Sequence, residues 1–185
     1  MVGRLVILDR DGVINRESEA FVKSPAEWLP IDGSIDAIAR LSGAGFVVAV
    51  ATNQSGIARR LLDVPALDAI HDKLRAAVRA AGGDLGRIVY CPHLPEDDCD
   101  CRKPRPGLLR RLSRAYGVPL DNVPVVGDSE RDIDAALAVG ARPVLVLSGN
   151  GARTRAAFDA AGREVETWRD LAEFAERLVA EVRGG

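Results

Sequence analysis

The chain has 185 residues, of which 47% are hydrophobic and 28% are charged, and its formal net charge is −2. This composition is typical of a globular protein with a full core and excludes a disordered chain, a collagen-like repeat and a coiled coil. The near-neutral charge and the lack of a long apolar stretch give no sign of nucleic-acid or membrane binding. Because no leader-like segment precedes the first apolar run, we expect a cytoplasmic protein. The length predicts one domain over residues 1–185, and we expect it to be monomeric.

Short apolar runs alternate with segments of helical spacing. In chain order the spacing predicts a strand at 5–8, a helix at 35–41, a strand at 46–51, a helix from 63 to 78, a strand at 87–91, a helix at 108–116, a strand at 123–126, a helix at 133–137, a strand at 144–147 and a final helix at 168–182. Thr167 is the expected N-cap of that last helix. Strands alternating with helices predict a Rossmann-like α/β fold, a mostly parallel sheet with helices on both faces.

Two long segments, 10–32 and 92–107, lack either pattern. Each follows a predicted strand, so we expect both at the carboxyl edge of the sheet, where open α/β sheets bind ligands. Long loops in compact domains are usually functional. The segments after the first two strands hold only a loop and single helices, so we expect a minimal cap domain or none.

The first strand ends in Asp9-Arg10-Asp11-Gly12. A spacing of two places both carboxylates on one side of the strand end. Two carboxylates so close do not both ionise easily, so one stays charged while the pKa of the other rises, which supplies a nucleophile and a proton donor. A solvated turn explains the tetrapeptide as well, because Asp and Gly are favoured in turns.

Three further strand ends carry residues suited to phosphate chemistry. They are Thr52 and Asn53 after the second strand, Lys103 after the third, and Asp128 with Asp132 after the fourth. A hydroxyl, an amide and an ammonium can hold phosphoryl oxygens, and carboxylates suit Mg²⁺. Each residue alone is explained by a cap, a turn or surface charge, but four such strand ends together indicate a site for phosphate chemistry.

All three cysteines lie close together with one of the two histidines. Cys91, His93, Cys99 and Cys101 fall within eleven residues. Three thiolates and an imidazole complete a tetrahedral Zn²⁺ shell with no open position for water, so we predict a structural zinc loop over 91–101. The alternatives are buried inert cysteines and a redox sensor.

These motifs, in this order, resemble the haloacid dehalogenase-like superfamily. The resemblance implies a phosphatase that forms an aspartyl-phosphate: Asp9 would attack phosphorus, and Asp11 would protonate the leaving alkoxide and then deprotonate water. Thr52 and Lys103 would stabilise the transferred phosphoryl group. Catalytic Mg²⁺ would be held by Asp9, by the backbone carbonyl of Asp11 and by Asp128.

Longer matches narrow the resemblance. The stretches 9–15 and 52–59, the zinc loop and 104–107 are similar to the family of D-glycero-D-manno-heptose 1,7-bisphosphate 7-phosphatases, which serve nucleotide-activated heptose and lipopolysaccharide core biosynthesis. The related histidinol-phosphate phosphatase domain shares the zinc loop, and the short loop here is nearer to that domain in length. Asn15 and the 55–59 stretch favour the heptose enzyme. A phospho-acceptor signalling module fits less well, because its phosphorylated Asp follows the third strand.

Without a cap, substrate selectivity is expected from the rim of the site. The candidate substrate-binding residues are Glu17, Ser18, Glu19, Ala20, Asn53, Gln54, Ser55, Arg102 and Ser129. Glu17, Ser18 and Glu19 can hydrogen-bond sugar hydroxyls, and Arg102 can pair with a second phosphate. The expected partner is therefore a small sugar bisphosphate, with no nucleic acid and no membrane.

Overall fold

A parallel sheet of six strands organises the chain in the computed structural model, which describes residues 4–184. The strands are β1 (Arg4–Leu8), β2 (Phe46–Asn53), β3 (Ile88–Cys91), β4 (Pro124–Gly127), β5 (Arg142–Val146) and β6 (Glu166–Trp168). Their order across the sheet is β3-β2-β1-β4-β5-β6. β1 and β4 are buried almost throughout, because a parallel strand covered on both faces needs apolar side chains on both sides.

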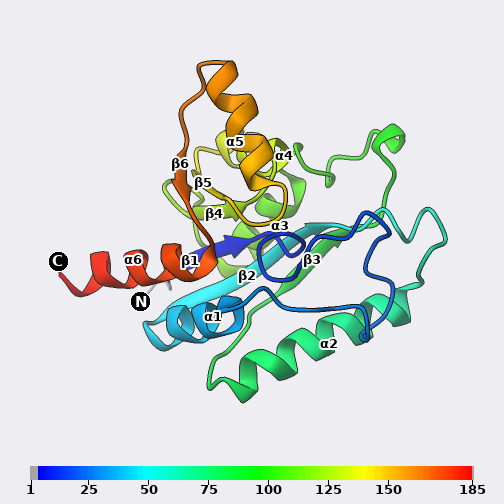
Figure 1. The fold of residues 1–185 in the computed structure, drawn as a ribbon, viewed down its shortest axis with the longest axis horizontal. Helices are drawn as coiled ribbons and strands as arrows, with labels where there is room; N and C mark the ends of the chain where they lie inside the picture. Colours follow the sequence, from blue (N-terminus) through cyan, green and yellow to red (C-terminus); the bar gives the residue numbers. More distant parts are fainter. Residues whose placement is uncertain (1–3, 185) are drawn as a thin grey trace.

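Helices cover both faces of this sheet (Figure 1). They are α1 (Ser34–Gly43), α2 (Val64–Ala80), α3 (Gly107–Tyr116), α4 (Glu130–Leu137), α5 (Gly151–Ala160) and α6 (Leu171–Arg183). One apolar cluster packs α1, α2 and α6 on one face, and a second packs α3 and α4 on the other. The predicted Rossmann-like fold with helices on both faces is confirmed.

Local chemistry explains where individual helices begin. Asp63 caps α2, since its side chain accepts a hydrogen bond from the backbone N–H of Ala66 (2.8 Å), and Pro65 lies in the first turn. Along α2, Leu67, Ile70 and Leu74 return to the buried face at helical spacing.

The C-terminal third differs from the sequence-based prediction. Thr167 is not a helix cap but the middle residue of β6, and α6 starts only at Leu171, after Asp170, whose side chain accepts from the N–H of Glu173 (2.9 Å). Helix α5 was not predicted, because its sequence carries only a weak apolar stripe, and its three buried residues are Gly151, Thr154 and Phe158. A short edge strand and a weakly amphipathic helix give little periodic signal.

The strand order reverses beside β1. The chain runs from β1 outward through β2 to β3, then returns to β4 on the other side of β1. The loops that leave β1 and β4 therefore separate and open a crevice at the carboxyl edge. Within residues 4–184, no inserted cap covers this edge, and no helix is long and apolar enough to cross a membrane.

Candidate active site

The strand register aligns the predicted residues along one edge of the sheet. Leu8 of β1 pairs with Val50 of β2 and with Val126 of β4, and the N–H of Asp9 donates to the carbonyl of Val126 (2.8 Å). Asn53 pairs with Cys91 at the end of β3. Parallel pairing thus brings the ends of β1, β2 and β4, which are remote in sequence, to the crevice.

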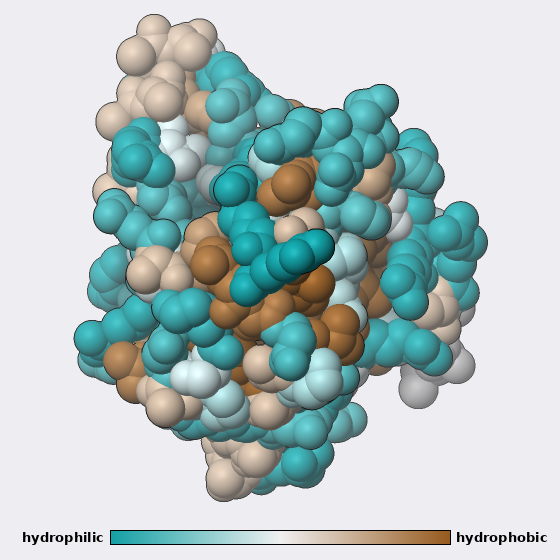
Figure 2. Space-filling view, turned by 90° about the vertical axis from the view of Figure 1, so that its right-hand side faces the viewer, coloured by the Kyte–Doolittle hydropathy of each residue, from teal (hydrophilic) through white to brown (hydrophobic). Residues whose placement is uncertain are grey.

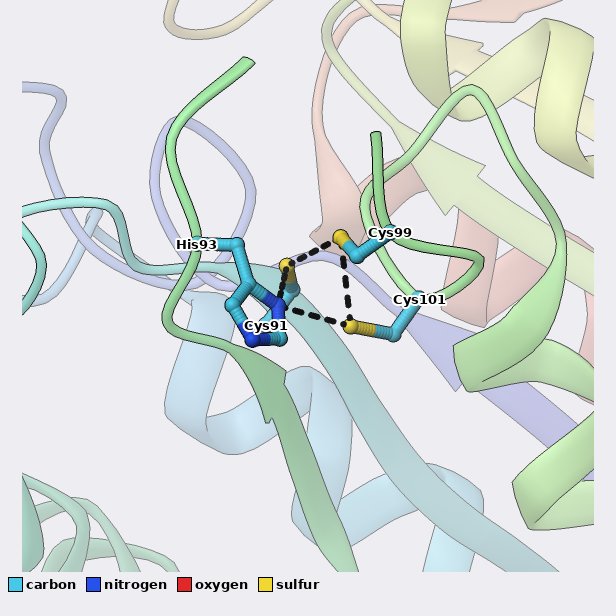
Figure 3. Close-up of side chains that lie close together, drawn as sticks. All are labelled: Cys91, His93, Cys99 and Cys101. Carbon is cyan, nitrogen blue, oxygen red and sulfur yellow. Dashed lines mark hydrogen bonds between the residues drawn. The ribbon is translucent and has the colours of Figure 1, made fainter. Parts of the chain in front are cut away.

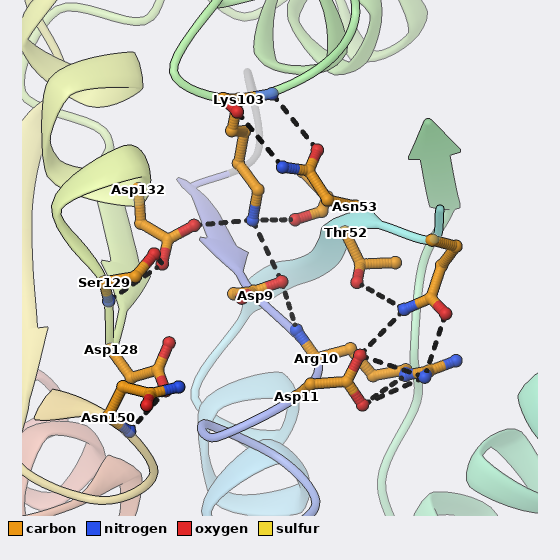
Figure 4. A network of polar contacts seen from close by, with 12 residues as sticks. Asp9, Arg10, Asp11, Thr52, Asn53, Lys103, Asp128, Ser129, Asp132 and Asn150 are labelled. Carbon is orange, nitrogen blue, oxygen red and sulfur yellow. Dashed lines mark hydrogen bonds and ion pairs between the residues drawn. The ribbon is translucent and has the colours of Figure 1, made fainter. Parts of the chain in front are cut away.

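Lys103 lies at the centre of this edge (Figure 4). Its side chain is buried, and its Nζ lies 2.9 Å from Asp9, 2.6 Å from Asp132 and 2.8 Å from the carbonyl of Ala51. The amide of Asn53 holds the Lys103 backbone from both sides, donating to its carbonyl and accepting from its N–H, each at 3.1 Å. The ammonium is therefore fixed beside the Asp9 carboxylate.

The charges of this group are strongly interdependent. Burial raises the pKa of Asp9 to about 7, with further increases from Asp132 and Asp128, although Lys103 opposes the rise. Burial alone would lower the pKa of Lys103, but Asp132 and Asp9 outweigh it and raise that pKa above its usual range. Three carboxylates around one ammonium leave an excess of negative charge that a cation or an incoming cationic ligand would relieve.

Asp128 faces Asp9 across the crevice from the end of β4. Gly12, at φ +79°, passes so close to the Asp128 carboxylate that a Cβ there would collide with it. On the other side, the N–H of Asn150 donates to Asp128 Oδ2 (2.7 Å), and the hydroxyl of Thr154 donates to the Asp128 carbonyl (2.8 Å). Burial and the nearby Asp132 raise the pKa of Asp128 to about 7.

The donors fit a hard divalent cation. Carboxylate oxygens of Asp9, Asp128 and Asp132 lie within 4.8 Å of one another. Asp132 is also engaged by Lys103 and accepts from the hydroxyl of Ser129 (2.6 Å), which leaves Asp9 and Asp128 as the freer oxygen ligands. The Asp11 side chain is not part of this cluster.

Hydrogen bonds from three buried side chains hold the Asp11 carboxylate away from Asp9. It accepts hydrogen bonds from Arg10 (2.9 Å), Asn15 (2.8 Å) and Gln54 (2.8 Å). Burial alone would raise the pKa of Asp11, but the Arg10 charge and these donors lower it. The raised pKa of the pair therefore lies on Asp9 and not on Asp11, which is the reverse of the expectation that the proton donor carries it. Arg10 is fully buried, and its Nη1 lies 3.3 Å from Nε2 of His71 on α2. Both aspartates line one small cavity of about 70 Å³.

Thr52 and Ser129 take up positions on opposite sides of the cluster. The buried Thr52 hydroxyl accepts from the Gln54 amide (2.9 Å), so its own proton remains available to a phosphoryl oxygen. Ser129 is the N-cap of α4 and lines the same cavity as Asp9 and Thr52. The side chains of Asp9, Thr52 and Lys103 therefore converge on a space of the right chemistry for a phosphoryl group.

A wider pocket of about 220 Å³ adjoins this cavity and contains most of the predicted rim. Glu17, Ser18, Glu19, Asn53, Gln54, Ser55 and Arg102 line it. Ala20 does not line the pocket, and its carbonyl instead accepts from Lys23 (2.8 Å). Figure 2, turned so that this side faces the viewer, shows mainly hydrophilic residues around a smaller hydrophobic area.

The four predicted zinc ligands form a compact cluster (Figure 3). The Sγ atom of Cys99 lies 3.6 Å from that of Cys91 and 3.5 Å from that of Cys101, while Nδ1 of His93 lies 3.5 Å and 3.3 Å from Cys91 and Cys101. A tetrahedral Zn²⁺ with Zn–S bonds of about 2.3 Å separates its sulfur ligands by about 3.8 Å. The cluster therefore has the size and the donor set that Zn²⁺ requires.

Several residues of the site were not predicted from the sequence. The turn 148–150 after β5 approaches the crevice, where the Ser148 hydroxyl donates to the Gly12 carbonyl (2.7 Å). The sequence does carry a signal for this turn, because residues 148–150 are another polar, glycine-containing segment directly after a predicted strand. The sequence carries no signal for Arg10 or Arg131. The burial of Arg10 and the position of Arg131 at the pocket both depend on tertiary packing.

Comparison with known proteins agrees with this geometry. The profile of the polynucleotide kinase 3 phosphatase family matches residues 5–136, and that of the HAD-hydrolase-like family matches residues 100–174. The D-glycero-beta-D-manno-heptose-1,7-bisphosphate 7-phosphatase of Pseudomonas putida is 59% identical over 151 residues, 82% of this chain and 86% of that protein. The enzyme of the same name from Bordetella bronchiseptica is 51% identical over 178 residues, covering 96% and 99% of the two chains.

A solved structure is similar in fold as well. The D,D-heptose 1,7-bisphosphate phosphatase of B. bronchiseptica, crystallised with magnesium and phosphate, has a TM-score of 0.92 at 50% identity and covers 96% of this chain and 99% of that one. Sequence identity and fold agree over nearly the whole chain. The protein is therefore a phosphatase that belongs to the D-glycero-beta-D-manno-heptose-1,7-bisphosphate 7-phosphatase family of HAD-like hydrolases.

Proposed function

We propose that the chain removes the C7 phosphate of D-glycero-D-manno-heptose 1,7-bisphosphate. The observation that carries the proposal is the buried Lys103 ammonium, 2.9 Å from Asp9, at the bottom of a crevice with an uncapped polar rim. The names of the relatives at 51–59% identity support the substrate.

In this proposal Asp9 is the nucleophile. Its carboxylate oxygen attacks phosphorus, the bond to the C7 oxygen breaks, and Asp11 donates a proton to that oxygen. Asp11 then takes a proton from the water that attacks the aspartyl-phosphate, and inorganic phosphate leaves. Two displacements through a covalent intermediate divide a very slow hydrolysis into two faster steps.

The remaining residues stabilise charge. Lys103 and the Thr52 hydroxyl donate to the equatorial oxygens of the transferred phosphoryl group, where negative charge is concentrated. Asp9, Asp128 and the backbone carbonyl of Asp11 would hold Mg²⁺, which supplies electrostatic neutralisation of the phosphoryl oxygens when bound. Arg10, Asn15 and Gln54 orient Asp11.

Zn²⁺ has a structural role in this proposal. The four donors at 91–101 close a shell around it and leave no position for substrate. Cys101 is followed directly by Arg102 and Lys103, so a fixed loop also fixes the residues that meet the phosphates. The Arg102 guanidinium donates to the His93 carbonyl (3.1 Å), which ties its position to that of a zinc ligand.

Phosphate release across a substrate panel tests the proposal. The panel contains the heptose 1,7-bisphosphate in both anomers, the heptose 7-phosphate, histidinol phosphate and p-nitrophenyl phosphate, each with Mg²⁺. We expect the highest kcat/KM with the bisphosphate and retention of the C1 phosphate in the product. A higher kcat/KM for histidinol phosphate would assign the chain to the related activity instead.

A further inference from the structure

The pocket beside the reacting centre is bordered by two guanidinium groups from different elements. Arg102 directly follows the zinc loop, and Arg131 lies in the first turn of α4. Arg131 lines the 220 Å³ pocket, the 70 Å³ cavity around Asp9, and a third hollow of about 230 Å³ beside the zinc loop. Among residues 4–184, it is the one side chain common to all three of these hollows.

Neither guanidinium is neutralised by the protein. No carboxylate within the described part of the chain forms an ion pair with Arg102 or Arg131, whereas the neighbouring Arg105 pairs with Asp98. Both arginines line the 220 Å³ pocket and the 230 Å³ hollow, so the two cations face the same space. Two unpaired arginines facing one pocket are unfavourable unless an anion lies between them.

Among the described residues, no other charged group of the crevice supplies an anion for these two arginines. Lys103 is already engaged by Asp9 and Asp132 at the bottom. Glu17 and Glu19 border the same pocket, but within residues 4–184 neither forms an ion pair with Arg102 or Arg131. Both guanidinium groups are therefore left without a paired carboxylate at this pocket.

We propose that Arg131 is a specificity-determining residue, which binds the phosphate that is not hydrolysed jointly with Arg102. The inference rests on the proposed function and extends it, since a bisphosphate carries a second dianion when the first phosphate is held at Lys103. The guanidinium of Arg131 on α4 and that of Arg102 after the zinc loop approach that dianion from two sides, and each can form two parallel N–H···O hydrogen bonds with it.

Substitution of Arg131 separates this role from a role in the chemistry. The variant Arg131→Gln removes the charge at an exposed position and is expected to fold normally. We expect kcat/KM for the bisphosphate to fall about 10- to 100-fold, as for loss of one charged hydrogen-bonding group, and kcat/KM for the heptose 7-phosphate to fall much less. The inhibition constant of the heptose 1-phosphate product should rise by a similar factor.

Two further variants serve as controls. Arg131→Lys keeps the charge without the planar fork and should recover part of the loss. Arg79→Gln removes an exposed arginine in the last turn of α2 and should change none of these constants.

The outcomes separate the inference from the proposed function. A wild-type chain that hydrolyses the monophosphate better than the bisphosphate contradicts both. A wild-type chain that prefers the bisphosphate, with Arg131→Gln keeping that preference or losing both substrates equally, overturns the inference alone. Unchanged product inhibition in Arg131→Gln would overturn it as well.

Discussion

The buried ammonium of Lys103 lies 2.6 Å from the carboxylate of Asp132. Lys103 lies two residues after the zinc loop and Asp132 lies in α4, so this ion pair joins two segments on either side of the crevice. Ser129 holds the second oxygen of Asp132 through its N–H (3.1 Å) and its hydroxyl (2.6 Å). Asp132 therefore positions the Lys103 ammonium beside Asp9. Asp132 itself does not occupy the position of the nucleophile, Asp9.

Lys103→Met should abolish activity and destabilise the fold. The substitution leaves the carboxylates of Asp9 and Asp132 buried without their cation, and removal of one partner from a buried ion pair costs about 3–5 kcal/mol. Urea unfolding measures the free energy of unfolding. The matched control is Lys23→Met, whose ion pair with Glu27 is partly exposed and is worth about 0–1 kcal/mol. Equal stability of the two variants would contradict the central position of Lys103.

Asp9→Asn should abolish turnover, because an amide cannot attack phosphorus. Asp11→Asn should also be severely impaired, but a covalent phosphate on Asp9 should still form from esters with good leaving groups. Rapid-quench trapping with a radiolabelled ester measures this intermediate. Asp36→Asn, at an exposed position of α1, is the control and should retain full activity. Undiminished hydrolysis by Asp9→Asn would refute the assigned nucleophile.

The cluster of Cys91, His93, Cys99 and Cys101 should retain about one Zn²⁺ per chain through purification without added metal. Elemental analysis measures the content. Cys99→Ser should lower both the zinc content and the Tm. The loop buries few apolar side chains, so metal binding is what stabilises it. Asp100→Asn, an exposed change in the same loop, should alter neither. Zinc-free protein with full stability and activity would show that the loop folds without the metal.

Stability should fall in mild acid partly because of His71. Burial and then the Arg10 charge lower the pKa of His71 to about 3, while an unfolded histidine titrates near 6.5. Below about pH 6.5 the unfolded chain therefore binds a proton at His71 that the folded chain does not bind. The free energy of unfolding decreases as the pH falls through this range. This linkage amounts to about 2 kcal/mol between pH 7 and pH 5.

The measurement compares urea unfolding of the wild type and His71→Gln at the two pH values. Glutamine retains an acceptor for Arg10 but does not titrate, so the variant should lose about 2 kcal/mol less than the wild type over this range. Protonation of the zinc ligands affects both proteins alike and cancels in the difference. An identical pH dependence of the two proteins would mean that His71 is protonated in the folded state.

Arg102→Ala should impair the bisphosphate reaction more than hydrolysis of p-nitrophenyl phosphate. The small ester has no group to reach the outer pocket, so it does not use the remote contact. We expect a loss of about 1.5–3 kcal/mol in transition-state binding for the bisphosphate, obtained from the ratio of kcat/KM values. Equal losses for both substrates would place Arg102 with the transferred phosphoryl group or with the zinc loop, because its Nη1 also donates to the His93 carbonyl.

The sequence alone determined five of the six strands of the sheet and the identity of its polar edge. Continuous apolar runs such as Leu5–Leu8 are typical of strands buried on both faces, and a polar residue that ends such a run must lie at the carboxyl edge. The positions of Asp9, Thr52 and Asp128 followed from that rule. Lys103 lies twelve residues after the end of β3, and its place beside Asp9 depends on how the segment 92–107 folds. The spacing of three cysteines and one histidine likewise defines a metal shell before any folding is considered.

Only the tertiary structure decided how these groups share charge and space. The ion pair of Lys103 with Asp132, the buried Arg10 beside Asp11 and His71, and the approach of 148–150 to Asp128 all join segments far apart in the chain. Local periodicity carries no information on such contacts, since they depend on the packing of α2, α4 and β5 against the crevice. The same limit explains why β6 was read as a helix start: a three-residue edge strand is defined by its partner strand, not by its own sequence.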